Sequence, residues 1–527
     1  MVNYKKWQLF YQSIFFNFMS RSGLKICFVG IGAKQLSISI LSAIAKNNGY
    51  KTSLAYNASL FDDRWNLQSK ILGSFFDEGK EVLAKIKLEN PDVLAFSPLT
   101  STYQWSLSIA KKAKKDNPDL KIIFGGVHVS AVPDLVIEEN FIDFVVVGEG
   151  EVALIKILEN LEQDKENSIE IPNTIYRGEN GQLVRGPLIS FCKDLDSLPF
   201  YDQEIWKDYF NLNELYTTTV SRGCPNKCTY CFNSFFSKIP ENNKGYLRFR
   251  SVEDVIEELL KVKENYNISY IDFVDDAFTA DKNWLKKFLQ AYRENIDLPF
   301  QCLTDSKYID KDIGNWLKKS RCEWVQVGVQ SVDADYKKNE LKRYETVDQI
   351  TSAIKVLKEN NIKIKLDHML GLPDEPIEAQ RDAFKVYKKN TPERIQTFWT
   401  TYLPGTEMLA KEYEKGRISD QKLRRIKLGK EVASHRKIIN QLDNNKLKIY
   451  KRYELIFKIL PSLPYLIKKR IKPNTVENLP IEILTPFIFL IDILTGLINK
   501  NPDFIQYLKH YKYQISRVLK NKINFRG

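Results

Sequence analysis

The first 190 residues alternate short apolar runs with amphipathic stretches. Four apolar runs lead into glycine or proline, as strands do where they enter a loop: residues 24–32, 91–100, 120–128 and 142–151. Stretches with helical spacing lie between them, such as 37–49, which stops at Gly49. Strands that alternate with helices form parallel sheets covered on both faces, with ligands at the carboxyl ends of the strands. We therefore predict a doubly wound, Rossmann-like α/β domain.

A second set of alternating elements follows a connector at 194–203. Six further apolar runs are typical of strands: residues 216–222, 268–276, 299–305, 324–331, 362–373 and 395–406. Helical stretches such as 252–263 separate these runs. Six βα units predict a full or partial (β/α)6 barrel of the TIM type, whose chemistry would lie on the loops after the strands.

The C-terminal fifth carries the positive charge of the chain. The formal net charge is +13, and residues 420–527 hold 23 of the 79 lysines and arginines but 8 of the 66 acidic residues. Such a region suits an anionic partner or a solvated helical face. The apolar run 480–498 is long enough to cross a bilayer, but four residues interrupt it: Glu482, Pro486, Asp492 and Gly496. We therefore predict a basic, mainly helical region in which this run is a buried or interfacial helix.

The N-terminus and the cysteine count bear on the compartment. Two lysines precede an apolar stretch, but Gln8, Gln12 and Asn17 interrupt it and no small-residue cleavage site follows. We predict a helical extension over residues 1–22 rather than a signal peptide. Seven cysteines, most of them far apart, do not form a secreted disulfide framework. We therefore expect a cytoplasmic protein, or one that associates with a membrane surface.

Three of the seven cysteines lie within eight positions, in the loop after the first strand of the predicted barrel. The segment C-P-N-K-C-T-Y-C contains Cys224, Cys228 and Cys231. Three thiolates can hold three irons of a [4Fe–4S] cluster and leave the fourth iron open to a ligand. Zinc is the alternative metal, but it prefers four ligands, and no histidine or fourth cysteine lies nearby in sequence. Three unrelated buried cysteines are disfavoured by the Gly, Pro, Asn and Lys around them.

This motif, with the aromatic Tyr230 before its last cysteine, resembles the CxxxCxΦC signature of radical S-adenosylmethionine (SAM) enzymes. The resemblance extends from about residue 23 to residue 416. A cobalamin-binding domain joined by D-L-D-S-L-P-F to a radical SAM barrel is similar to the cobalamin-dependent radical SAM family, and to its class B methylases. The expected units are an N-terminal helical extension, a cobalamin-binding domain, a connector, a radical SAM barrel and a helical basic region: residues 1–22, 23–192, 193–213, 214–418 and 419–527.

The resemblance implies SAM-binding residues in the barrel. The three cysteines would ligate a cluster whose open iron binds the amino and carboxylate groups of SAM, and Tyr230 would lie near the adenine. Asp275 and Asp276 follow the second strand, where the family places an acidic residue near the SAM amino group, although the usual Gly-Gly-Glu is absent. Gln330 and Ser331 end the fourth strand and would reach the SAM ribose or carboxylate. Ordinary capping of strand ends is the alternative for these residues.

The resemblance also implies cobalamin contacts in the first domain. S-P-L at 97–99 resembles an S-x-L turn, and G-G-V-H at 125–128 resembles the glycine loop beside the nucleotide tail. The D-x-H-x-x-G loop of many cobalamin proteins is replaced by G-I-G-A-K-Q-L-S-I-S, so that loop offers no histidine to cobalt. The expected contacts are Ser97, Leu99, Gly125, Gly126 and His128, the last as a loop histidine that hydrogen-bonds to the cofactor or the backbone.

Two further residues have open alternatives. Glu149, in G-E-G-E, is expected to start a helix or to join the two domains rather than to bind a ligand. His368, at the end of the fifth barrel strand, faces either the substrate cavity or the core.

The function implied by the resemblance is methylation of an unactivated carbon. In the family a 5′-deoxyadenosyl radical removes a hydrogen atom from the substrate, and methylcobalamin supplies the methyl group. Cyclisation or rearrangement without methyl transfer is the alternative within the family, and a cobalamin-binding sensor is the alternative of another class. Expected partners are a small-molecule or lipid-like substrate, an electron donor such as flavodoxin or ferredoxin, and a membrane contacted peripherally by the basic region. No nucleic-acid partner is expected.

Overall fold

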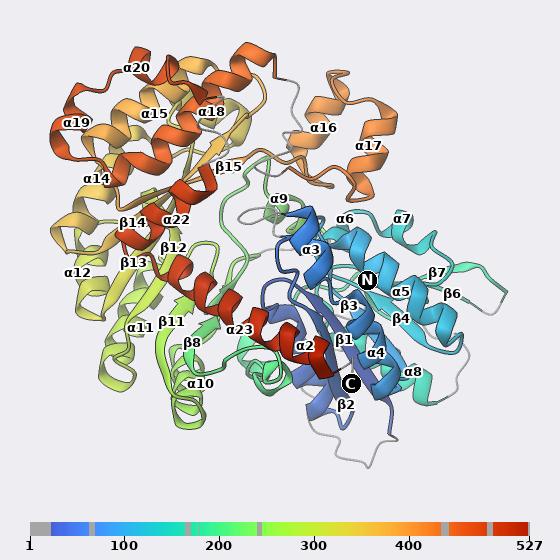
Figure 1. The fold of residues 1–527 in the computed structure, drawn as a ribbon. Coiled ribbons are helices and arrows are strands. Elements are labelled where there is room, and N and C mark those ends of the chain that lie inside the picture. The colour runs from blue at the N-terminus through green and yellow to red at the C-terminus, as the bar shows by residue number, and fades with distance from the viewer. Residues whose placement is uncertain are drawn as a thin grey trace.

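The computed structural model describes residues 23–62, 69–163, 170–178, 180–239, 245–433, 442–481 and 488–524. The predicted N-terminal extension lies outside these residues, as do residues 482–487 of the apolar run 480–498. Two sheets with their helices stand side by side, and a set of C-terminal helices adjoins both (Figure 1).

A seven-stranded sheet forms the first domain, in the order β2-β1-β3-β4-β5-β6-β7. The strands from β1 to β5 pair in parallel, whereas β6 and β7 extend the sheet antiparallel. Its strands are β1 Lys25–Ile31, β2 Lys51–Asn57, β3 Val93–Phe96, β4 Lys121–Phe124, β5 Phe144–Val146, β6 Thr174–Arg177 and β7 Leu183–Arg185. The sequence pattern predicted β1, β3, β4 and β5 but not β2, β6 or β7.

Successive strand residues pack into separate cores on the two faces of this sheet. Phe28 lies in the core that includes side chains of α2 and α8, whereas Cys27 and Val29 lie in the core beneath α4 and α5. This alternation is the period-two pattern of a strand buried on both sides, and it confirms the doubly wound fold. The helices are α2 Leu36–Asn47, α3 Lys70–Phe76, α4 Gly79–Glu89, α5 Tyr103–Asp116, α6 Val127–Ala131, α7 Pro133–Ile137 and α8 Glu151–Glu162.

The second sheet has six strands, all parallel, in the order β8-β11-β12-β13-β14-β15. Among the described strands β8 and β15 form its two edges, so the sheet is the predicted partial barrel rather than a closed one. All six strands coincide with predicted runs: β8 Glu214–Thr218, β11 Ile268–Phe273, β12 Phe300–Asp305, β13 Cys322–Gln330, β14 Lys363–Leu370 and β15 Arg394–Trp399.

Five helices connect consecutive strands of the barrel and bury their apolar faces in one continuous core with it. They are α10 Val252–Asn265, α11 Lys282–Asn295, α12 Lys311–Lys319, α14 Val347–Glu359 and α15 Ile377–Lys389. Shorter elements lie mostly at the carboxyl ends of the strands: the ribbon β9 Ser221–Arg222 with β10 Arg248–Phe249, α9 Phe232–Phe236, the 3₁₀ turn η3 Ser306–Tyr308, α13 Ala334–Tyr336, the π-turn η4 Lys337–Leu341, and α16 Glu407–Glu414. The connector between the domains holds two 3₁₀ turns, η1 Leu195–Ser197 and η2 Glu204–Trp206.

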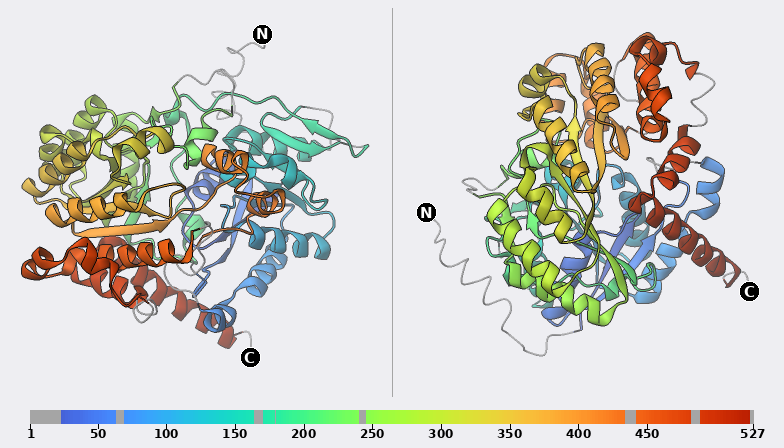
Figure 2. Two further views of the ribbon diagram at one scale, coloured as in Figure 1. Left: turned by 90° about the horizontal axis from the view of Figure 1, so that it is seen from above. Right: turned by 90° about the vertical axis from the view of Figure 1, so that its left-hand side faces the viewer.

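The C-terminal region is helical, as predicted. Its elements are α17 Asp420–Lys427, α18 Asn444–Ile459, η5 Leu460–Ser462, α19 Tyr465–Arg470, α20 Pro473–Glu477, α22 Ile488–Ile498 and α23 Pro502–Asn524. Helix α18 packs on the edge strand β15 and on α15, and α23 runs from the barrel to the first sheet (Figures 1 and 2). None of the described helices is long and apolar enough to cross a bilayer.

Candidate active site between the two sheets

The cysteine loop follows the ribbon strand β9 and is tied to the barrel by Thr229. The Thr229 backbone N–H donates to Leu341 O (3.1 Å), and its hydroxyl donates to Glu340 O (2.7 Å). Its carbonyl accepts from the Met408 N–H at 2.9 Å. These bonds to η4 and α16 fix the loop backbone without using any of the thiols.

The three thiols lie close enough to influence one another. Cys228 is buried and Cys224 and Cys231 are half-buried. Burial, with smaller contributions from the nearby Asp276 and Cys228, raises the pKa of Cys224 and of Cys231 to about 12. A thiol in this state ionises when a cation takes the place of its proton, because the cation compensates the cost of the buried charge.

Gly223 allows the loop to leave the ribbon beside its partner strand. Its φ is +91°, and a Cβ added there would lie 2.4 Å from the Tyr246 carbonyl oxygen. An L side chain fits neither the backbone angle nor the space. The residue before the first cysteine is therefore restricted to glycine by packing.

Arg343 is a buried residue of this site that the sequence analysis missed. Its Nη2 donates to Asp305 Oδ2 (3.0 Å) and to the Gly328 carbonyl (2.7 Å), and its Nε donates to Glu345 (2.6 Å). The remaining Nη1 lies 3.8 Å from the Cys228 Sγ and 3.3 Å from the Tyr230 hydroxyl. Arg343 thus places a positive charge against the cysteine motif, and two carboxylates hold it there.

Asp275 and Asp276 follow β11, as predicted, but they have different surroundings. The buried Asp275 carboxylate accepts from the backbone N–H of Val220 (3.1 Å) and of Ser221 (2.6 Å) and from the Ser221 hydroxyl. Asp276 accepts from Asn233 Nδ2 at 3.0 Å. Burial raises the pKa of Asp275 to about 7 and also raises the pKa of Asp276. Asp275 is therefore engaged in capping, and Asp276 has fewer protein partners.

Gln330 ends β13 and Ser331 follows it directly, close to the predicted position, with Gln330 in the left-handed region at φ 66°. The Ser331 side chain is fully buried, and its hydroxyl donates to Glu375 Oε1 at 2.7 Å. This bond commits Ser331 to the core and gives no support to its predicted contact with SAM.

The loops predicted to meet cobalamin lie at the carboxyl ends of β3 and β4. The Ser97 hydroxyl lies against Gly126, whose φ is +90° and whose missing Cβ would come within 2.7 Å of it. Ser97, Leu99, Gly125 and Gly126 all line one cavity.

His128 differs from the prediction, because it lies in helix α6 rather than in a loop. Its ring is buried, with Nδ1 3.1 Å from the Thr100 hydroxyl and its centroid 4.3 Å from that of Tyr103. The residue does not line the cavity, so its predicted contact with cobalamin finds no support. His368 is likewise a core residue, with ring nitrogens 3.0 Å from the Tyr387 hydroxyl and from Gln380 Oε1.

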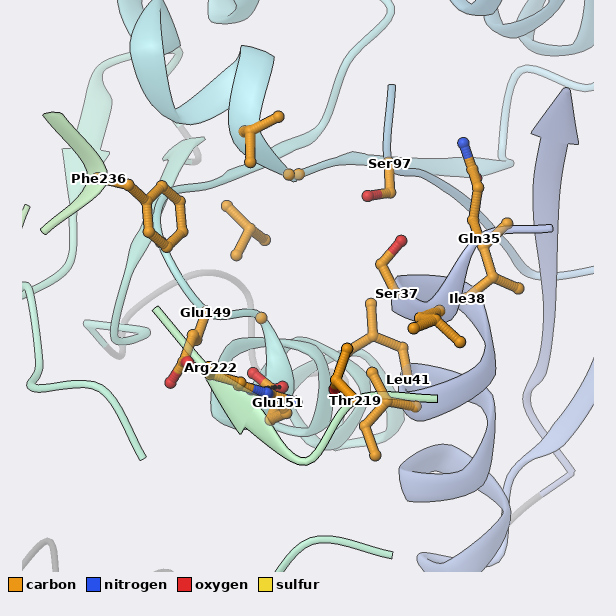
Figure 3. Close-up of a pocket in the computed structure, with 18 of the residues that line it drawn as sticks. Gln35, Ser37, Ile38, Leu41, Ser97, Glu149, Glu151, Thr219, Arg222 and Phe236 are labelled. Atoms are coloured by element: carbon orange, nitrogen blue, oxygen red, sulfur yellow. Dashed lines mark hydrogen bonds and ion pairs between the residues drawn. The ribbon is translucent and has the colours of Figure 1, made fainter. Parts of the chain in front are cut away.

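The cavity lies between the two sheets and has a volume of about 490 Å³. One wall comes from β3, β4 and α2 of the first domain. The other comes from β9 with Gly223 at the start of the cysteine loop, from α9, and from the Asp275–Asp276 segment. In Figure 3, Ser37 and Ser97 lie on one side and Phe236 and Glu149 on the other. The wall is mostly apolar, yet Gln35 Oε1 is buried in it with no hydrogen-bond partner among the described residues.

Charged residues join the two domains beside this cavity. Glu149 accepts from Arg248 (2.8 Å) and Arg222 (3.2 Å) of the ribbon, and Glu151 accepts from Arg222 at 2.7 Å. Although burial opposes it, the guanidinium groups of Arg222 and Arg248 hold the pKa of Glu149 below its usual range. The expectation that Glu149 joins the domains is thus confirmed.

The donor sets fit the cofactors predicted from the motif. Among the described residues, no three His, Cys, Asp or Glu side chains converge on a point that could hold a single metal ion. A cluster of four irons gives each of the three thiols an iron of its own. On the opposite wall, the unpartnered Gln35 oxygen and the Ser37 and Ser97 hydroxyls could bind the amide side chains of a corrin ring, while the apolar surface would cover its face.

Comparisons with known proteins find matches for both domains of the chain. The sequence model of the Radical SAM superfamily matches residues 218–386, and that of the B12 binding domain matches residues 35–158. An uncharacterized methyltransferase of Pyrococcus horikoshii is 27% identical over 377 residues, which span 70% of this chain and 80% of that protein. The anaerobic magnesium-protoporphyrin IX monomethyl ester cyclase of Rubrivivax gelatinosus is 23% identical, over 62% of this chain and 58% of its own length.

Two solved structures have the same fold. The cobalamin-dependent SAM radical enzyme OxsB matches 95% of this chain and 81% of its own, with a TM-score of 0.63 and 13% identity. The radical SAM methyltransferase TsrM from Kitasatospora setae matches 74% of this chain and 76% of its own, with a TM-score of 0.59 and 15% identity. Both family domains are present in the expected order, and the cofactors are therefore a [4Fe–4S] cluster, SAM and cobalamin. The chain belongs to the cobalamin-dependent radical SAM enzymes.

Proposed function

We propose that the protein is a methyltransferase that methylates an unactivated carbon of a small molecule. The observation that carries this proposal is that one cavity is shared by the two domains: it is lined both by the Asp275–Asp276 segment beside the cysteine loop and by the cobalamin-type loops at Ser97 and Gly125–Gly126. When bound, the cofactors supply one-electron chemistry that activates a carbon–hydrogen bond, and a methyl group for the activated carbon.

The residues of the chain hold and separate these cofactors. Cys224, Cys228 and Cys231 would ligate the cluster and leave one iron for SAM, with Tyr230 beside the adenine. Asp276, which has one amide partner, suits the SAM amino group better than Asp275, which is engaged by Val220 and Ser221. Gln330 stays a prediction for the SAM ribose or carboxylate.

The opposite wall would hold cobalamin through Ser97, Leu99, Gly125 and Gly126. The apolar side chains of Phe236, Val274 and Leu41 line the same space and would exclude water from the reacting carbon. A small substrate would occupy the part of the cavity that the cofactors do not fill. Because the lining is apolar, we expect an aliphatic or aromatic substrate. TsrM is described with tryptophan as its substrate, which agrees with a small-molecule substrate here.

The test uses the reconstituted holoenzyme with SAM carrying a deuterated methyl group and a chemical reductant. We expect both 5′-deoxyadenosine and S-adenosylhomocysteine, and a deuterated methyl group in the product once extracts supply the substrate. A product that carries no label would instead favour cyclisation or rearrangement. The Cys228→Ala variant should form neither nucleoside product, whereas Cys322→Ala, a buried cysteine of β13 away from the motif, should keep both. Absence of both nucleoside products in the wild type would support the sensor alternative.

The remaining partners are part of the same proposal. The cluster needs a one-electron donor, for which a flavodoxin or ferredoxin is suitable. A lipid-like substrate is compatible with the apolar lining of the cavity. Titration of the oxidised cluster with reduced flavodoxin, followed by its absorbance, tests the first point.

A further inference from the structure

Three large apolar side chains at the start of α19 are exposed. Tyr465, Leu466 and Ile467 keep 73%, 68% and 48% of their surface accessible. Single exposed apolar residues are common on monomers, but three consecutive large ones are not expected without a partner. None of the three belongs to a core cluster of the described residues.

Basic residues follow these side chains. Lys468, Lys469 and Arg470 come directly after Ile467, Lys472 follows one position later, after Ile471, and no acidic residue occurs between Glu454 and Glu477. Among the described residues, no carboxylate lies within ion-pair distance of these four cations. Another lysine adjoins them: Lys388 Nζ donates to the carbonyls of Lys469 (3.1 Å) and Ile471 (2.8 Å). The positive charge here is therefore not neutralised by the described part of the chain.

Helix α22 ends beside η5, the turn that precedes α19, and also exposes an apolar face. Leu490, Leu494, Leu497 and Ile498 are 44–65% exposed, and their spacing of four, three and one residues places them along one side of the helix. The other side is packed, with Asp492 paired to Arg394 (3.1 Å) and Lys458 (3.0 Å). Asn499, after α22, donates to the Ser462 hydroxyl at 3.2 Å, in the turn before α19.

We propose that residues 465–472 and the exposed leucines of α22 form a docking surface for an anionic lipid bilayer. Apolar side chains next to unpaired cations are the composition that inserts into the headgroup region while binding anionic lipid. A second copy of the chain is a poorer occupant, because a symmetric contact would bring two unneutralised basic clusters together. The surface is independent of the proposed methyl transfer.

The test is co-sedimentation of the holoenzyme with two kinds of vesicle. One is pure phosphatidylcholine, and the other contains about a third phosphatidylglycerol, which gives the surface a negative potential. We expect binding to the anionic vesicles at low salt, little binding to the neutral ones, and loss of binding at about 0.5 M salt, where screening shortens the reach of the charges. Absence of binding to anionic vesicles at low salt would overturn the proposal.

Two variants separate the apolar and the charged parts. K469E/R470E should weaken anionic-vesicle binding at least about 20-fold, since each juxtamembrane cation contributes severalfold and reversal adds repulsion. L466S/I467S should also weaken binding to the anionic vesicles, because the apolar insertion into the headgroup region is lost. The matched control K111E/K112E changes the same charge on the exposed face of α5 and should bind almost as the wild type does. Equal loss in the control would show a non-specific charge effect and overturn the assignment.

Correct folding and self-association are checked in the same samples. All variants should keep the far-ultraviolet circular dichroism and the iron content of the wild type, because the substituted side chains are exposed. Sedimentation velocity should show one species in each case. A wild-type dimer that L466S/I467S converts to monomer, without vesicle binding by either, would identify a second copy as the occupant and refute the lipid surface.

Discussion

At the scale of single residues, Gly223 is the position where backbone geometry most directly limits the site. Gly223→Ala forces φ +91° on an alanine and brings its Cβ against the Tyr246 carbonyl. We expect a loss of at least ~2 kcal/mol in unfolding free energy and a fall in bound iron, because the cysteine loop must move. Gly245→Ala is the control: its φ is +83° but nothing lies within 4 Å, so only the ~1 kcal/mol backbone cost applies. Equal iron loss in the two variants would show that the contact with the Tyr246 carbonyl is not the cause.

Arg343 carries the charge that faces Cys228. In Arg343→Met the buried Asp305 loses its ion-pair partner, whereas Glu345 keeps Lys337, and the unpaired Asp305 should cost about 3 kcal/mol in unfolding free energy. Loss of a donor to Cys228 should also lower the reduction potential of the cluster, as measured by titration monitored by electron paramagnetic resonance. Arg321→Met, whose pair with Asp297 is exposed, should cost about 1 kcal/mol or less and leave the potential unchanged. An unshifted potential in Arg343→Met would show a structural role alone.

Glu375 gives a pH-dependent prediction. Burial raises its pKa to about 7, while Ser331, Gln380 and Tyr450 donate to its carboxylate and oppose the shift. Because the folded state holds this proton more tightly than the unfolded state, Glu375 costs stability as the pH rises from about 4.5 to 7. Glu375→Gln should therefore gain about 2–3 kcal/mol relative to wild type between pH 5 and pH 8 in urea unfolding. Glu253→Gln, on the surface of α10, should show no such trend.

Sequence analysis identified the site residues that belong to local motifs. It missed those that only the folded chain brings together. The cysteine spacing and the turns at Ser97 and Gly125–Gly126 are local signals, and the structure places both beside the interdomain cavity. Arg343 has no such signal, because its partners Asp305 and Cys228 are 38 and 115 residues away. Ser331 and His128 resemble site residues by position, but their side chains turn to Glu375 and Thr100 instead.

At the scale of elements, α23 holds the two domains together. Near its start Asp503 pairs with Lys365 and Gln301 of the barrel, and near its end Arg517 binds both oxygens of the buried Glu78 (2.7 and 2.8 Å). Arg517→Met should cost about 3 kcal/mol, because Glu78 is left as an unpaired buried charge. It should also separate the unfolding of the first domain, followed by cobalamin absorbance, from that of the whole chain, followed by circular dichroism. Lys509→Met, in an exposed pair with Glu214, should have little effect; a single transition in both variants would contradict this role.

The helices and strands that were predicted are those whose hydrophobic residues recur with a clear period along the sequence. All six barrel strands were found because each is a buried run between amphipathic helices. Strand β2 was missed because its polar first half, Lys51–Ser53, does not look apolar, and β6 and β7 because they are short antiparallel additions. The exposed leucines of α22 show why 480–498 was hard to assign: its described part has exposed side chains such as Leu494 as well as core side chains such as Ile481.

At the scale of the whole molecule, the site exists only where the two sheets meet. Neither domain alone encloses the cavity, and their relative placement depends on Glu149 at one side and on α23 at the other. Sequence patterns describe each sheet by itself. They carry no information on how the two domains are placed relative to each other. A family resemblance supplied the order of the domains, and the ion pairs of Glu149 supply their contact.

Glu149→Gln tests this coupling. The amide keeps the shape of the side chain, but Arg248, only 9% exposed, loses its carboxylate partner, while Arg222 retains Glu151. Because the cobalamin wall and the cluster wall then lose their fixed register, cobalamin affinity should fall about tenfold, equivalent to ~1.4 kcal/mol. Iron content should be unchanged, since the cysteine loop is anchored within the barrel through Thr229.

Glu138→Gln, on the exposed end of α7, is the matched control. Parallel loss of iron and cobalamin in Glu149→Gln would indicate global unfolding, and unchanged cobalamin affinity would show that the register is held by α23 instead.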